Sequence, residues 1–216
     1  MKLPNAEHKA RPWRIHELVP DFTLEDVWAL PMRGGPEDVY GLLELVGSFE
    51  PSQLESGPTR FLWNLRDRLG IWLDLGEIST PVDGEEPGEL PIPGTIETSL
   101  RDRLPPDLRG STAGFTFGSL PFVPLYKTDR EAAAELSNKT VHGVAHLGWA
   151  DLGGGRYEGR MAVYVKPRGA FGRAYMAAIK PFRYWVVYPA LMRHMERVWD
   201  ARARGVASAT QMQPDD

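Results

Sequence analysis

Two long segments joined by a glycine-rich connection constrain the fold of this sequence most. In residues 139–150 and 157–166, more polar and more apolar side chains tend to alternate, a pattern typical of β-strands. The connection, Asp151-Leu152-Gly153-Gly154-Gly155-Arg156, has the length and composition of a hairpin loop. The sequence therefore predicts a long antiparallel pair in which Thr140–Trp149 lies beside Tyr157–Val165.

A second long pattern, with helical period, runs from Ala170 to about Ala203. Apolar residues recur there at intervals of three and four positions and would form one broad stripe against a sheet. They are Phe171, Tyr175, Ala178, Phe182, Trp185, Met192, Met195 and Trp199. Pro181 and Pro189 lack an amide hydrogen, so the helical carbonyls four residues before them lose their partners. We therefore expect a bent or two-part C-terminal helix.

Shorter patterns predict the remaining elements. A strand is expected over Trp13–Leu18, and a short helix over 23–30 that begins at a capping-box-like sequence and ends at Pro31. Further helices are expected over 36–46 and 58–69, and further strands over 115–117 and 121–127. The run Glu131–Leu136 has high helix propensity but room for one or two turns only, so its assignment stays open.

Together these patterns predict an α+β fold, in which an antiparallel sheet curls around a long C-terminal helix and short helices follow the first strand. The 216 residues suffice for one large domain, which we place at 1–204. Within it, residues 81–94 are acidic and rich in Pro and Gly, and are expected to form an exposed insert. Residues 205–216 are small and polar and are expected to be a frayed tail.

Composition excludes several classes of protein. The chain has no cysteine, which excludes disulfides, thiolate metal sites and dithiol redox chemistry. Its formal net charge of −4 argues against nucleic-acid binding, which usually needs a basic domain. There is no run of about 18 apolar residues and no apolar N-terminal stretch. We therefore expect a cytoplasmic protein without a membrane span.

The first candidate site lies on the hairpin. Thr140, His142 and His146 occupy alternate positions and would share one face of a strand, with the two histidines about 13 Å apart. That separation is too long for one metal ion, so no metal site is predicted. Either this face points outward while the apolar face packs on the C-terminal helix, or its side chains line a cavity with Asn138 and Tyr164. In a cavity, a histidine could exchange a proton with a ligand.

The C-terminal helix carries the other candidates. Lys180 and Arg183 are three residues apart on one helical face and could reach a single carboxylate or phosphate, or simply lie along the helix edge. Seven tryptophans must mostly be core, but one or two could face an aromatic ligand. We select Trp149 and Trp185 for that role, with Tyr175 and Phe182 nearby.

Several strings of the sequence stand out together. They are Trp28-Ala29-Leu30-Pro31 after Pro20-Asp21-Phe22, then residues 135–143, 161–167 and 175–183. In this order they resemble the bacterial family called domain of unknown function 2867, from about Ala10 to Asp200. The resemblance implies the START-like (SRPBCC) helix-grip fold, with a cavity between sheet and terminal helix. It implies no reaction. Some relatives are fused to a nucleotide-binding reductase domain, which this sequence lacks.

We therefore expect a small-molecule-binding protein that encloses a hydrophobic, aromatic or lipid-like ligand between the sheet and the C-terminal helix. No cofactor is predicted. One alternative is a cavity enzyme, a cyclase, isomerase or hydrolase, in which His142 or His146 acts as general base and Tyr164 as proton donor. Another is an interaction module that contacts a reductase partner through its basic helix or its acidic insert. A homodimer is a further alternative.

Overall fold

The structure, a computed structural model, describes residues 1–50, 98–118, 120, 122–138 and 140–211. Its elements, in chain order, are β1 (Lys2–Leu3), α1 (Asn5–Lys9), α2 (Ile15–Leu18), β2 (Thr23–Gly34), η1 (Pro36–Asp38), α3 (Val39–Gly47), η3 (Leu100–Arg103), η4 (Pro106–Leu108), β3 (Val123–Lys127), β4 (Glu131–Ser137), β5 (Val141–Asp151), β6 (Tyr157–Pro167), α5 (Gly169–Phe182), the π-helical turn η5 (Arg183–Val187) and α6 (Tyr188–Gln211).

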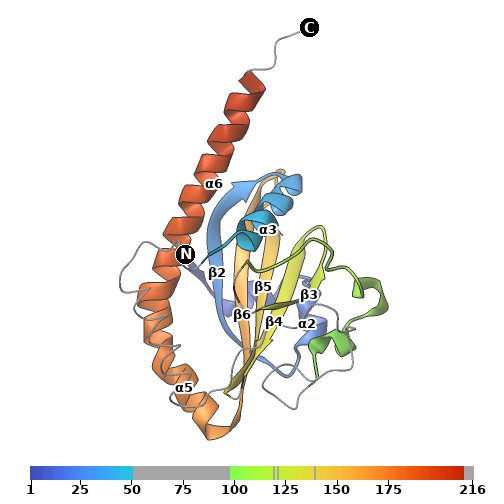
Figure 1. Cartoon of the computed structure of the whole chain (residues 1–216), viewed down its shortest axis with the longest axis vertical. Helices are drawn as coiled ribbons and strands as arrows, with labels where there is room; N and C mark the ends of the chain where they lie inside the picture. Colours follow the sequence, from blue (N-terminus) through green and yellow to red (C-terminus); the bar gives the residue numbers. More distant parts are fainter. Residues whose placement is uncertain (51–97, 119, 121, 139, 212–216) are drawn as a thin grey trace.

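The described strands form one antiparallel sheet of six, in the order β1-β2-β6-β5-β4-β3 (Figure 1). Its centre is the predicted hairpin: β5 and β6 pair from Val141 opposite Pro167 to Asp151 opposite Tyr157. The three glycines of the connection, Gly153–Gly155, all have positive φ. Side chains disfavour that backbone conformation, which explains the triple glycine. The predicted hairpin is confirmed.

The predicted helix over residues 23–30 is wrong. These residues belong to β2, which pairs with β6 through Leu24 opposite Tyr164 and Trp28 opposite Met161. The pairing shifts register between Leu24 and Asp26, so Glu25 is the extra residue of a β-bulge. A bulge breaks the alternation of inward and outward side chains, and this removed the strand signal from the sequence.

Two other expectations need correction, and the open assignment of residues 131–136 is resolved. Residues 13–18 form no strand: Ile15–Leu18 is a single helical turn whose two ends are buried. Residues 115–117 form no strand, although Phe115 and Phe117 are buried in the core. Glu131–Ser137 is the strand β4, because pairing with β3 and β5 overrides the helix propensity of its alanines.

Other expectations are met or lie outside the described residues. The helix expected over 36–46 is confirmed as η1 and α3, and the strand expected over 121–127 as β3. The helix expected over 58–69 and the insert expected over 81–94 lie outside the described residues. The helix α6 continues to Gln211, within the range for which we expected a frayed tail, and 212–216 lie outside the described part.

The predicted break in the C-terminal helix is confirmed. Pro189 is the second residue of α6, and the wider turn η5 lies directly before it. A wider turn accommodates the missing amide hydrogen of a proline, so α5 and α6 form a bent rod. In the rod, α6 packs against β2 and α5 against β6, and α6 continues past the end of the sheet (Figure 1).

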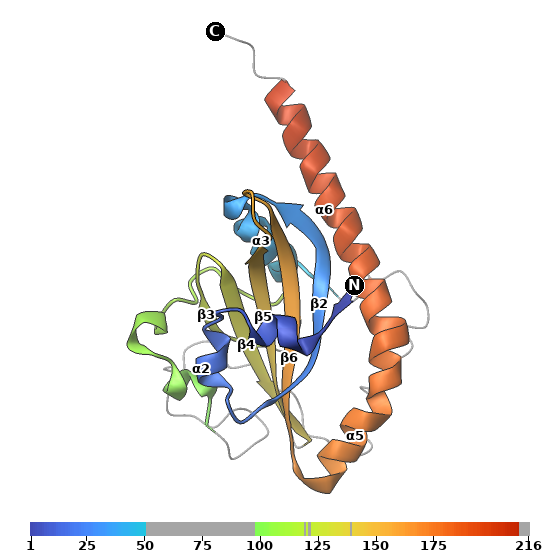
Figure 2. The same ribbon diagram turned by 180° about the vertical axis from the view of Figure 1, so that it is seen from behind.

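The sheet is covered on both faces. One face, here called the helix face, presents Ala145, Leu147 and Trp149 of β5 to α3 and α6. The other, here called the histidine face, carries His142, Val144 and His146 and lies under α1, α2, η3 and η4 (Figures 1 and 2). The histidines therefore point away from the C-terminal helix, and they are buried rather than exposed.

Candidate functional site

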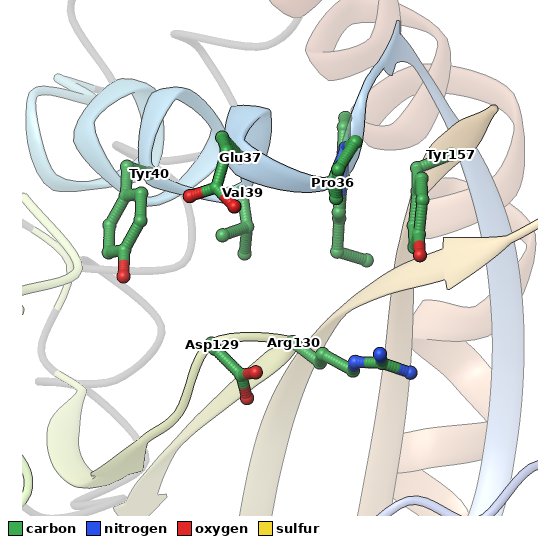
Figure 3. A pocket seen from close by; sticks show the side chains of 8 residues that line it. Pro36, Glu37, Val39, Tyr40, Asp129, Arg130 and Tyr157 are labelled. Carbon is green, nitrogen blue, oxygen red and sulfur yellow. The ribbon is translucent and has the colours of Figure 1, made fainter. Parts of the chain in front are cut away.

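A pocket of about 160 Å³ opens where α3, the β3–β4 turn and the loop-side ends of β5 and β6 meet (Figure 3). Its walls are Pro36, Glu37, Val39, Tyr40, Asp129, Arg130, Trp149 and Tyr157. For comparison, an engineered apolar cavity of about 150 Å³ holds one benzene molecule. The pocket therefore has the size of a single aromatic ring.

Two parallel aromatic rings stand in the wall of this pocket. The ring planes of Trp149 and Tyr157 are 7° apart and their centroids are 6.5 Å apart. Stacked aromatic pairs have centroids about 4.5 to 7 Å apart, so the two rings form one continuous aromatic surface in the wall. Trp149 is fixed, because its Nε1 donates to the Gly35 carbonyl at 2.8 Å and its ring packs 6.1 Å from that of Trp199.

Local hydrogen bonds hold both rims of the pocket. In the β3–β4 turn, Thr128 Oγ1 accepts from the amides of Arg130 and Glu131 at 3.2 and 3.1 Å. On the opposite rim, the Gly35 amide donates to Asp38 Oδ2 at 2.8 Å, where η1 begins. Because these bonds are local, the rims are preformed and a ligand would not have to order them.

Three charged side chains line the pocket: Glu37 from η1, and Asp129 and Arg130 from the β3–β4 turn. All three are exposed, and within the described residues none of their side chains makes a hydrogen bond or an ion pair. Figure 3 shows Glu37 and Tyr40 on one wall, with Asp129 and Arg130 facing them from the other. The pocket therefore combines aromatic surface with charges of both signs.

A second group of polar side chains is buried on the histidine face, and we call it the histidine network. Its members are His8 (α1), His16 (α2), Tyr126 (β3), Glu131 (β4), His146 (β5) and Tyr164 (β6). Glu131 Oε2 accepts from His146 Nε2 and from the Tyr126 hydroxyl, both at 2.8 Å. Burial would raise the pKa of Glu131, but these bonds outweigh it and the pKa is lowered. The network therefore holds a buried carboxylate.

The remaining bonds of the network fix the proton positions of two histidines. His16 Nε2 lies 3.3 Å from the carbonyl oxygen of His8, which only accepts, so this nitrogen carries the hydrogen. In the neutral ring, His16 Nδ1 then accepts from the Tyr164 hydroxyl at 3.2 Å. The Tyr164 oxygen in turn accepts from His8 Nε2 at 2.9 Å.

His8 is held neutral in this setting. Burial, followed by the neighbouring His146 and His16, lowers the pKa of His8 to about 2. A second proton would sit on Nδ1, which has no hydrogen-bond partner among the described residues. His146 and Tyr164, the predicted base and donor, thus belong to one network, but neither lines the pocket.

The other hairpin candidates have separate partners. His142 Nε2 lies 2.9 Å from Glu135 Oε2, which also accepts from the Leu100 amide at 3.1 Å. Asn138 Oδ1 accepts from the amide and hydroxyl of Thr140, at 2.8 and 2.7 Å. Asn138 and Thr140 therefore shape the connection between β4 and β5, and neither they nor His142 line the pocket.

A third cluster joins β2 to the bend of the C-terminal rod, and we call it the Asp26 cluster. The Asp26 carboxylate is fully buried and accepts from four side chains: Arg183 and Tyr188 at 2.9 Å each, Trp28 at 3.2 Å and Tyr184 at 3.3 Å. Burial and then Asp26 raise the pKa of Tyr184 to about 12. With four donors the carboxylate is saturated, so this cluster fixes the bend.

The site residues predicted on the C-terminal helix do not lie together in one site. Arg183 belongs to the Asp26 cluster, whereas Lys180 lies 3.4 Å from Glu25, so the two cations do not share one anion. The Trp185 side chain is 80% exposed. Tyr175 and Phe182 are half-buried, and Tyr175 packs with Val141, Val165 and Met176. Of the site residues named from the sequence, Trp149 alone lines the pocket.

Sequence reasoning missed most of the pocket. Glu37 and Tyr40 lie about 90 residues from Asp129 and Arg130, and only the pairing of distant strands brings them together. The short Thr128-Asp129-Arg130 link between two strand-like segments was the available signal, since Thr and Asp are common in tight turns. It indicated a turn but not what faces it.

Two further kinds of feature, a metal site and a membrane-spanning helix, are not found among the described residues. Among them, no group of three or more His, Asp or Glu side chains could hold a metal ion. In the same ranges, no helix combines the length and the apolar character that crossing a lipid bilayer requires.

Comparison with curated proteins and with solved structures finds no match. Comparison with protein families finds a match over residues 18–190, which includes strands β2 to β6 of the sheet and the first part of the C-terminal rod. This range also contains every residue of the pocket. Since the match covers most of the chain, the protein belongs to the family described as protein of unknown function DUF2867.

Proposed function

We propose that this protein binds a small planar aromatic molecule in the pocket beside Trp149. The observation that carries the proposal is the parallel pair Trp149 and Tyr157, 6.5 Å apart in a pocket of about 160 Å³. Ligand sites typically combine aromatic walls with a few polar groups, and this pocket has both. Its volume favours one ring over a lipid chain.

We further infer that the fold is of the START-like helix-grip type. Two features support this: the C-terminal rod follows the last strand and packs on β2 and β6, and the hairpin β5–β6 lies at the centre of an antiparallel sheet. In such a fold, ligands bind between the sheet and the terminal helix. The pocket lies at one end of that layer, where Trp149 contacts Trp199 of α6.

Binding is favoured over catalysis by His146 and Tyr164, because these two side chains lie away from the pocket. A general base must come within hydrogen-bond reach of its substrate. His146 and Tyr164 are on the histidine face, already paired with Glu131 and with His8 and His16. The pocket is on the helix face, and none of the described residues in its wall is a histidine.

The test is a titration with the single-ring probes 2-phenylethanol and phenol, followed by NMR. The indole N–H signal of Trp149 should shift, because that group borders the pocket and donates to Gly35. Tyr157→Ala removes one of the two rings and should weaken binding by about three- to ten-fold. Tyr175→Ala is the matched control, since Tyr175 is also half-buried but lies outside the pocket.

Two results would contradict the proposal. One is that no probe moves the Trp149 signal at millimolar concentration. The other is that Tyr175→Ala weakens binding while Tyr157→Ala does not. That outcome would place the ligand between β6 and α5, where Val163, Tyr175 and Ile179 are also only partly buried.

A further inference from the structure

Three exposed charged side chains lie together in one small pocket. Some exposed charges elsewhere form ion pairs, such as Arg14 with Asp107 at 2.6 Å and Arg103 with Asp21 at 2.7 Å. Glu37, Asp129 and Arg130 have no such partner in the described residues, although all three line one pocket of about 160 Å³.

The arrangement keeps opposite charges apart. Asp129 and Arg130 are neighbours in the sequence, yet their side chains point in different directions from the β3–β4 turn (Figure 3). The Thr128 hydroxyl fixes this turn through the Arg130 and Glu131 amides, and the Trp149 amide donates to the Arg130 carbonyl at 2.7 Å. The backbone from which the two side chains extend is therefore fixed.

Each of these groups matches a different part of a ligand. A guanidinium binds a carboxylate through two parallel hydrogen bonds, so Arg130 fits a ligand anion. Glu37 and Asp129 fit a ligand ammonium, which aromatic faces such as that of Tyr40 also attract. The parallel rings of Trp149 and Tyr157 fit the planar part.

We propose that the ligand is an aromatic zwitterion, a single ring carrying both an ammonium and a carboxylate group, which is the chemistry of an aromatic amino acid. This inference rests on the proposed function, since it assigns the charge of a ligand held in the same pocket. The three charged side chains are exposed, so each contact is screened by water and should change affinity by about two- to five-fold. The ring contributes the remainder.

The test compares four probes that share one ring and differ in charge. Phenylalanine carries both groups, phenethylamine the ammonium alone, 3-phenylpropionate the carboxylate alone, and 2-phenylethanol neither. In calorimetric or NMR titrations, phenylalanine should bind best and 2-phenylethanol worst, with each charged group contributing about two- to five-fold.

Two variants assign the charges to residues. Arg130→Gln should weaken phenylalanine and 3-phenylpropionate and leave phenethylamine unchanged, whereas Asp129→Asn should weaken phenylalanine and phenethylamine and leave 3-phenylpropionate unchanged. Arg173→Gln and Asp200→Asn are matched controls, because both side chains are exposed on the rod and outside the pocket.

The outcomes separate this inference from the proposed function. If all four probes bind equally well, or if Arg130→Gln and Asp129→Asn change nothing, the zwitterion is wrong and the aromatic pocket stands. If 3-phenylpropionate or phenethylamine binds better than phenylalanine, the ligand carries one charge and the zwitterion is again overturned. If no probe binds, the proposed function itself is wrong.

Discussion

Asp26 shows how one residue can organise a distant element. It has no exposed surface, and a buried carboxylate is costly unless donors surround it. Its four donors come from β2 itself and from the bend of the rod, more than 150 residues away in the chain. The bulge at Glu25 turns Asp26 toward the rod, so a single irregular residue in β2 creates the anchor of the C-terminal helix.

Replacing Asp26 by Asn should therefore destabilise the fold strongly. The variant keeps the shape but removes the charge, which leaves the Arg183 guanidinium buried without an anion. Breaking a buried ion pair from one side costs about 3 to 5 kcal/mol. Urea unfolding measures the change, with Asp107→Asn as control, because Asp107 is paired with Arg14 at the surface, where water screens the pair, and its loss should cost far less. Equal effects in the two variants would contradict this view of Asp26.

The same residue explains why the charged candidates on the rod were misjudged. From the sequence, Lys180 and Arg183 share a helical face and could hold one ligand anion. In the structure each pairs with a carboxylate of β2, Glu25 or Asp26. Because residues 23–30 were expected to be helical, nothing in the sequence suggested that two acidic side chains would face the rod there.

At the scale of elements, the sequence predicted those structural features whose signal lies in residues close together in the chain. The hairpin β5–β6 has its signal in two adjacent segments and their glycine loop, and the bend of the rod follows from Pro189. The strands β2 and β4 were missed or left open, because β2 pairs with β6 across more than 120 residues and β4 is rich in alanine. In both, pairing with other strands overrides local propensity, although β4 pairs with the strands next to it in the chain.

The junction between β6 and α5 gives a prediction at this scale. A Cβ on Gly172 would lie 2.2 Å from the carbonyl oxygen of Thr140, closer than atoms can approach. Gly172→Ala should therefore displace the first turn of α5 and cost about 1 to 3 kcal/mol, although alanine is the better helix former.

Gly143→Ala is the matched control for Gly172→Ala. Gly143 lies within β5, where the added Cβ would come no closer than 3.7 Å to the Leu136 side chain, an ordinary contact. The control should be neutral or slightly stabilising in thermal unfolding, because alanine has less backbone entropy to lose than glycine. A stable Gly172→Ala protein would show that α5 does not need this close approach.

At the scale of the whole molecule, the sequence predicted the cover of one face of the sheet and missed the other. The helix face is covered by α3 and the rod, which have clear periodic patterns. The histidine face is covered by short pieces, α1, α2, η3 and η4, that carry almost no pattern. From the sequence, His142 and His146 either pointed outward or lined a cavity. Because of this second layer they do neither: both are buried and paired with carboxylates.

The second layer also makes stability depend on pH. His8 has a pKa of about 2 in the folded protein, far below its ordinary value of 6.5. Below pH 6.5 the unfolded chain therefore binds a proton that the folded chain does not, and the free energy of unfolding falls as pH falls. The slope approaches about 1.4 kcal/mol per pH unit. Glu131, with its lowered pKa, contributes stability that is lost only as pH falls below its ordinary value of 4.5.

The window from pH 6.5 to 5 therefore separates the effect of His8 from that of Glu131, and urea unfolding across it tests the assignment. His8→Gln cannot take up the proton, but its amide can still donate to the Tyr164 hydroxyl, the partner of His8 Nε2. The slope should be smaller in the variant by up to about 1.4 kcal/mol per pH unit, whatever its absolute stability, because the slope depends on the number of protons taken up on unfolding. An unchanged slope in His8→Gln would mean that another group, and not His8, takes up the proton on unfolding.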